Sequence, residues 1–271
     1  MVEYIDVDGG RIAYGVAGDG PLVVAAPGMG EIRQTYRFLV PILVDAGLRV
    51  ATMDIRGHGD TSRNGWGSYG QTAIGADLVA LIDHLGGPAI VVGQSFTPDS
   101  ALFAATERPD AVTATVLIAP WARSPSLNPL LRIAQGAVVR VPALWAMFYR
   151  SLYPGARPAD FDGYVSVLRT SLTGKRGMAA LAAMADPVSR DAARYRARAT
   201  QPALIVMGAK DPDFGDPRAE AEAMAADLAG PVEIVMIDGA GHYPHAQAPA
   251  KTGAAILDFL QRIGLQQAHD A

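Results

Sequence analysis

The chain has 271 residues, of which half are apolar and 18% are charged, and its formal net charge is −4. This length and composition predict one large α/β domain or a core with an inserted cap, and they exclude a disordered protein. The chain contains no cysteine, which excludes disulfides, thiol nucleophiles and cysteine-based metal sites. No basic run is longer than two residues, so we expect no nucleic-acid partner.

The sequence contains no pattern typical of a signal peptide or a membrane-spanning helix. Residues 1–4 lack the charged and apolar regions of a signal peptide. The apolar stretch 138–149 is too short to cross a bilayer and contains Arg140 and Pro142. We therefore expect a cytoplasmic protein without a membrane partner.

The first 119 residues alternate short apolar runs with helical patterns. Residues 4–7 and 11–15 flank an Asp-Gly-Gly turn, which predicts a hairpin. The expected buried strands, all short apolar runs, are 21–26, 49–54, 89–92 and 113–119. The expected helices between them are 35–46, 72–85 and 98–107.

This alternation stops after Pro120 and resumes near residue 201. The intervening residues 121–200 contain no convincing strand pattern and are rich in aromatic residues, Met and Arg. Strands are expected again at 203–207 and 232–237, with helices at 217–228 and 248–263. The pattern predicts a mostly parallel sheet with helices on both faces, formed by residues 1–120 and 201–271. Residues 121–200 are predicted to form a helical cap over this core.

The pentapeptide Gly93-Gln94-Ser95-Phe96-Thr97 lies between an expected strand and an expected helix. A serine on such a sharp turn is lifted clear of the backbone, where a neighbouring base can activate its hydroxyl. The first N–H groups of the following helix would face an oxyanion formed there. Thr97 occupies the last glycine position of the usual G-x-S-x-G pattern, which weakens the motif when it is read alone.

A nucleophilic serine needs a base and an acid, and both have two candidates. His242 and His245 follow the last expected strand, and Asp211 and Asp213 follow the strand before it. Sites in open α/β sheets form beyond the carboxyl ends of the strands, so Ser95 can meet these residues there. Asp211 is favoured by its spacing from the preceding glycine, and His242 because it directly follows a Gly-Ala-Gly turn.

Five stretches together resemble the α/β-hydrolase superfamily, and the resemblance covers nearly the whole chain. By the resemblance, Ser95 is the nucleophile, Asp211 the acid and His242 the base. It also implies that the backbone N–H groups of Met29 and Phe96 bind the oxyanion. The stretches that carry it are Pro27-Gly28-Met29-Gly30, residues 54–62, the Ser95 pentapeptide, Gly208-Ala209-Lys210-Asp211 and Gly241-His242-Tyr243-Pro244-His245.

Two of these stretches need a further comment. Pro27-Gly28 stands where many relatives have His-Gly, and this change need not remove a backbone donor. Asp54, Arg56 and His58 are expected to hold a glycine turn. Asp54, Arg56 and His58 are therefore not expected to take part in catalysis.

The C-terminal histidines also permit a metal site. Asp238, His242 and His245 have suitable ligand types for it. We expect neither a metal nor a cofactor, because the base role already accounts for His242.

These residues predict acyl transfer to water, in which an ester, thioester or lactone is cleaved through an acyl-enzyme. Trp121, Trp145, Phe148 and Tyr149 are tentative pocket residues whose character predicts a largely apolar small-molecule substrate. Each of them could instead pack the cap onto the core.

The resemblance leaves other functions open, because the combination of Ser, Asp and His also serves carbon–carbon bond hydrolases and cofactor-free perhydrolases in this superfamily. A ligand receptor or signalling protein with slow or no turnover is the alternative from a different functional class.

Overall fold

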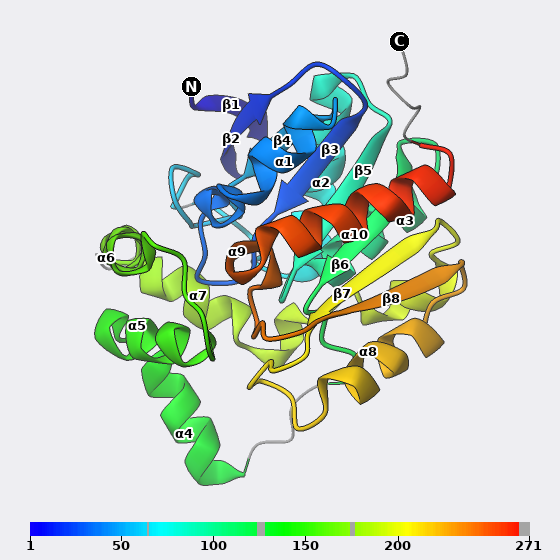
Figure 1. The fold of residues 1–271 in the computed structure, drawn as a ribbon. Helices are drawn as coiled ribbons and strands as arrows, with labels where there is room; N and C mark the ends of the chain where they lie inside the picture. The colour runs from blue at the N-terminus through cyan, green and yellow to red at the C-terminus, as the bar shows by residue number, and fades with distance from the viewer. Residues whose placement is uncertain (64, 124–127, 174–176, 266–271) are drawn as a thin grey trace.

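The computed structural model describes all residues except 64, 124–127, 174–176 and 266–271. Eight strands of the described chain form one sheet in the order β1-β2-β4-β3-β5-β6-β7-β8 (Figure 1). Only the pairs β1–β2 and β2–β4 within this sheet are antiparallel, which confirms the predicted mostly parallel sheet. The strands are β1 (Glu3–Val7), β2 (Gly10–Ala17), β3 (Leu22–Ala26), β4 (Arg49–Met53), β5 (Ala89–Gln94), β6 (Val112–Ile118), β7 (Ala203–Gly208) and β8 (Val232–Ile237).

Helices cover both faces of this sheet. In Figure 1, α1 and α10 lie in front of it, whereas α2 and α3 lie behind it. All residues of β3, β5 and β7 are buried, as expected for strands covered on both sides. The helices of the core are α1 (Leu39–Asp45), α2 (Gln71–Leu85), α3 (Pro98–Glu107), α8 (Pro217–Ala226), α9 (Pro244–Gln247) and α10 (Pro249–Arg262).

The helix expected at 35–46 is divided in two. A 3₁₀-helix, η1, spans Arg33–Tyr36, and α1 begins only at Leu39. Pro41 has no N–H to donate, so a helix tolerates it only in the first turn. The helix that contains Pro41 must therefore begin close to it, and the preceding turn is a separate element.

The described part of the segment between β6 and β7 contains helices and connecting loops but no strand. It comprises α4 (Pro129–Val138), α5 (Pro142–Ser151), α6 (Phe161–Ser171), α7 (Gly177–Met184) and the 3₁₀-helices η2 (Pro187–Ser189) and η3 (Ala193–Arg198). Helices α4 to α7 gather beside the core at the lower left of Figure 1. Tyr149 and Phe161 of this segment pack with Ile32 and Tyr243 of the core in one buried cluster. Aromatic contacts thus hold the inserted helices to the sheet domain.

None of the helices described is both long and apolar enough to span a membrane.

Candidate active site

Ser95 lies on a strained turn between β5 and α3. Its φ angle is 58°, in the left-handed region that residues other than glycine seldom adopt. Its backbone N–H donates to the carbonyl of Ile118 at 2.9 Å, which fixes the turn to the end of β6. A Cβ atom on Gly93 would lie 2.5 Å from the carbonyl oxygen of Thr97, so this position requires glycine. The chain therefore turns sharply at Ser95.

Thr97 adds a second connection to this turn. Its hydroxyl oxygen accepts a hydrogen bond from the N–H of Gln94 at 2.9 Å. The same hydroxyl lies 2.9 Å from the carbonyl of Ala26, to which it donates. The side chain is fully buried, and its hydroxyl also lies 3.1 Å from the carbonyl of Gln94. All three contacts are with backbone atoms, and a glycine at this position could make none of them. Thr97 thus ties the Ser95 turn to the end of β3.

Ser95, His242 and Asp211 form a continuous hydrogen-bonded chain. Nε2 of His242 lies 2.9 Å from Oγ of Ser95. Nδ1 of His242 lies 2.7 Å from Oδ2 of Asp211, and both side chains are buried. Because the carboxylate accepts the Nδ1 proton, Nε2 is left to accept the hydroxyl proton of Ser95. Asp211 follows β7 and His242 follows β8, so neighbouring strand ends bring the three residues together.

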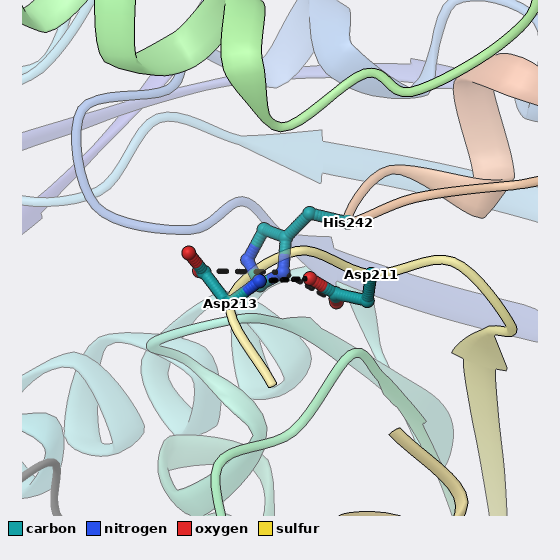
Figure 2. A group of neighbouring side chains, drawn as sticks. All are labelled: Asp211, Asp213 and His242. Atoms are coloured by element: carbon teal, nitrogen blue, oxygen red, sulfur yellow. Dashed lines mark hydrogen bonds and ion pairs between the residues drawn. The ribbon is translucent and has the colours of Figure 1, made fainter. Parts of the chain in front are cut away.

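A second carboxylate faces the same imidazole. Figure 2 shows both Asp211 and Asp213 directed toward His242, and Oδ2 of Asp213 lies 3.6 Å from Nδ1. Burial lowers the pKa of His242, but the charges of Asp211 and Asp213 outweigh it and raise that pKa to about 9. Burial also raises the pKa of Asp213. The two carboxylates therefore stabilise the imidazolium form of His242, which is the form produced when Nε2 accepts the Ser95 proton.

His245 lies in helix α9 and contacts a different part of the core. Its Nε2 lies 3.0 Å from the hydroxyl of Thr35, and burial lowers its pKa to about 3. Among the described residues, the group of side chains able to offer ligands to a metal is Asp211, Asp213 and His242, whose ligand atoms lie within 4.8 Å of one another. A metal bound there would displace a hydrogen bond of His242. Asp238 and His245 do not belong to this group.

Within the described chain, two backbone donors near Ser95 are free: the N–H of Met29, in the loop after β3, and the N–H of Phe96, which follows Ser95. The neighbours of Met29 are both paired. Gly28 donates its N–H to Oε1 of Gln94 at 3.0 Å, and Gly30 donates to Nε2 of His58 at 2.9 Å. Burial lowers the pKa of His58 to about 4, so this ring is neutral and can accept. Across the part of the chain that is described, no protein group accepts the N–H of Met29 or Phe96.

Gln94 holds this loop in a way that the sequence motif did not indicate. Besides accepting from Gly28, its side-chain amide donates to the carbonyl of His242 at 3.4 Å. The residue beside Ser95 thus bridges the loop of Met29 and the loop of His242. Its place beside Ser95 in the pentapeptide is the only sequence signal for this role.

A cavity of about 860 Å³ opens over Ser95 and His242. Of the four aromatic residues expected in the pocket, Trp121, Trp145 and Phe148 line it. Tyr149 does not: its ring is fully buried beside Tyr153, with the two hydroxyl oxygens 2.7 Å apart. Further apolar lining comes from Met29, Phe96, Val138 and Phe214.

Comparisons with known proteins agree with this architecture. The sequence model described as "Alpha/beta hydrolase family" matches residues 23–255. The 2-(acetamidomethylene)succinate hydrolase of Mesorhizobium japonicum is 30% identical, over 94% of this chain and 94% of its own length. Epoxide hydrolase A of Mycobacterium tuberculosis is 26% identical, over 97% of this chain and 98% of its own.

Solved structures give the same assignment. A hydrolase from Pseudomonas aeruginosa is 26% identical and superposes with a TM-score of 0.76, over 96% of this chain and 98% of its own. A serine hydrolase involved in carbazole degradation shares the fold, with a TM-score of 0.80 at 20% identity over 97% of this chain and 99% of its own. This chain belongs to the alpha/beta hydrolase family.

Proposed function

We propose that this protein hydrolyses an ester, thioester or lactone of a small molecule through an acyl-enzyme on Ser95. The observation that carries the proposal is the chain of two hydrogen bonds, 2.9 Å from Ser95 Oγ to His242 Nε2 and 2.7 Å from His242 Nδ1 to Asp211. A serine hydroxyl is a weak nucleophile on its own, and an adjacent oriented base is what activates it. No cofactor is needed for this chemistry.

The acylation step uses groups already in place. Nε2 of His242 accepts the Ser95 proton while Oγ attacks the substrate carbonyl. The unpaired N–H groups of Met29 and Phe96 stabilise the resulting oxyanion, and Asp211 stabilises the imidazolium. His242 then gives its proton to the leaving group, and the acyl group stays on Ser95.

Deacylation reverses these roles with water as the nucleophile. The neutral His242 accepts a proton from water as the water oxygen attacks the acyl carbonyl. Collapse of the second tetrahedral intermediate returns the proton to Oγ of Ser95 and releases the acid. One cycle consumes one water molecule and leaves the three side chains as they began.

Serine chemistry favours an acyl substrate over an epoxide, although several relatives are named epoxide hydrolases. Attack of Oγ on an epoxide carbon would give an ether. An ether has no carbonyl that water could attack, so Ser95 would remain alkylated. An acyl group on Ser95 keeps its carbonyl and can be released.

The inserted helices are proposed to act as a cap that selects the substrate. Trp145 and Phe148 of α5 line the same cavity as Ser95 and His242. The predominantly apolar lining favours an apolar body in the acyl or the leaving group.

The test is the steady-state hydrolysis of a panel of p-nitrophenyl esters by the protein and by its Ser95→Ala variant. We expect the variant to lose about 10⁴-fold or more in kcat, because the three side chains act as a unit. His245→Ala is the matched control, and we expect it to keep most of the activity. Near-normal turnover by pure Ser95→Ala protein would refute the proposal, and one-to-one binding with almost no turnover would favour a ligand receptor.

A further inference from the structure

Arg190 lines the same cavity as Ser95 and His242. It directly follows the 3₁₀-helix η2, near the end of the inserted segment. Its guanidinium carbon lies 5.1 Å from the centre of the Trp121 ring. Trp121 packs edge-to-face on Phe214 at 4.8 Å, and Phe214 lies 6.3 Å from His242. Two successive aromatic contacts therefore connect this cation with the proposed base.

The guanidinium of Arg190 has no hydrogen bond or ion pair with any other residue that the structure describes. The carboxylates whose charges act on it most are Asp99 and Asp213. Asp99 accepts two hydrogen bonds from Arg196, at 2.7 and 2.8 Å. Asp213 faces His242 at 3.6 Å. Because both carboxylates are engaged elsewhere, the N–H donors of Arg190 remain available to a ligand.

Holding an unpaired positive charge at the position of Arg190 costs free energy. Burial lowers the pKa of its guanidinium, although Asp99 and Asp213 oppose that shift. A partly buried cation without hydrogen-bonded partners loses hydration that no protein group replaces. A bound anion would supply the missing acceptors.

We propose that Arg190 binds a carboxylate of the substrate, so that the acyl compound cleaved at Ser95 carries a carboxylate at the end remote from its scissile carbonyl. This inference rests on the proposed function, whose substrate class it narrows. The substrate would lay an apolar spacer along Trp121 and Phe214, between the guanidinium and the reacting carbonyl.

The surroundings of Arg190 favour a carboxylate over a phosphate. A guanidinium offers two parallel N–H donors that match the two oxygens of a carboxylate. The cavity wall also contains Asp213, Asp216 and Glu220. These acidic groups would repel a phosphate dianion more than a carboxylate, which carries a single charge.

The experiment compares two esters with the same leaving group, p-nitrophenyl butyrate and the mono-p-nitrophenyl ester of glutaric acid. They differ chiefly in the terminal carboxylate. In Arg190→Gln, we expect kcat/KM for the charged ester to fall roughly 10- to 100-fold, and that for the neutral ester to change less than about threefold. Arg190→Lys keeps the charge without the planar fork and should lie between the two.

Arg123→Gln is the matched control. Arg123 lines the same cavity, but its side chain is 69% exposed. We expect this change to leave the ratio of the two esters within about threefold of the original, because an exposed cation is hydrated and screened. Equal melting temperatures of the variants would show that folding is not the cause of a difference.

Binding in a Ser95→Ala background tests the carboxylate site separately from turnover. Dissociation constants for both esters are measured by calorimetry with and without Arg190→Gln. Selective weakening of the charged ester supports the site, even if the protein with Ser95 proves inactive and the proposed function fails. An unchanged ratio of the two esters in both assays would overturn the Arg190 site while leaving the hydrolase proposal standing.

Discussion

His242 lies between the hydroxyl of Ser95 and two carboxylates, and this arrangement sets the pH at which it can act as a base. Its pKa is raised to about 9 because the charges of Asp211 and Asp213 outweigh the opposing effect of burial. Only the neutral imidazole accepts the Ser95 proton, so kcat/KM of the free enzyme should rise with pH as His242 loses its proton.

Asp213→Asn should move this rise to lower pH. The change removes one of the two charges that stabilise the imidazolium, while the hydrogen bond between His242 and Asp211 stays. The measurement is the pH profile of kcat/KM for a neutral ester. A midpoint that stays in place or moves upward would contradict the electrostatic role of Asp213.

Asp211→Asn provides the contrast. This change removes the acceptor that holds His242 in its tautomer, and we expect a loss of roughly 10³- to 10⁴-fold in kcat. A larger loss in Asp213→Asn than in Asp211→Asn would show that the acid is misassigned.

For single residues, the sequence could predict that those directly after strand ends, such as Ser95 and His242, lie close together, because the topology alone brings the strand ends together. It could not predict that Gln94 bridges two loops, or that Arg190 has no hydrogen-bonded partner among the residues described. Those properties depend on contacts between residues far apart in the chain, such as the 148 positions that separate Gln94 from His242.

Helix α5 joins the cap to the loop that carries Met29. Trp145 is 2% exposed, and its indole lies against Gly30, where a Cβ atom would overlap the ring. Phe148 lies on the same helix and lines the cavity, but it is only half-buried. The two aromatic residues should therefore respond differently to truncation.

Phe148→Ala should change the preference for acyl-chain length by about 1–3 kcal/mol, since it removes an apolar contact in the cavity. Trp145→Ala should in addition lower stability by about 3–5 kcal/mol, because it leaves a void at the contact between cap and core. Chain-length profiles and unfolding curves of both variants provide the measurement. Unchanged profiles in both would defeat the idea that the cap selects the substrate.

The sequence predicted most of the elements correctly, because their apolar periodicity and glycine stops are local signals. The helix α3 begins and ends where its pattern indicated, at Pro98 and Glu107. The division between η1 and α1 was missed, because the helical pattern extends from Pro41 toward the N-terminus, whereas the helix that contains Pro41 must begin within a turn of it.

The stability of the whole molecule should depend on the ionisation of Glu31, which is fully buried beneath the inserted helices. The hydroxyl of Tyr164 in α6 donates to its Oε2 at 2.5 Å. Burial raises the pKa of Glu31 to about 7, although hydrogen bonds from Tyr164 and Tyr149 oppose the shift. A raised carboxyl pKa favours the folded state while the group is protonated, so this stability is lost as pH rises from about 4.5 to about 7.

Glu31→Gln removes this ionisation and should flatten part of the pH dependence of stability. The difference in the free energy of unfolding, unmodified protein minus variant, should decrease by up to about 3 kcal/mol from pH 5 to pH 8. Urea unfolding across this range measures the difference. A constant difference between the two proteins would show that Glu31 does not titrate in the folded state.

The mostly parallel order of the sheet is what brings residues 95, 211 and 242 to one place, since β5, β7 and β8 all end at the same edge. The alternation of strands and helices was sufficient to predict this arrangement. The wall of the cavity could not be predicted in the same way, because it depends on how α4 and α5 pack. Tyr149, for example, faces the buried aromatic cluster rather than the cavity.

The proposed mechanism requires Ser95 to be a nucleophile that His242 activates. The most direct measurement is labelling with a fluorophosphonate, followed by mass spectrometry of the modified peptide. We predict one adduct per chain, on Ser95, and at least about a 100-fold slower reaction in His242→Ala. An adduct on another residue, or labelling of Ser95 that proceeds unchanged without His242, would contradict the account.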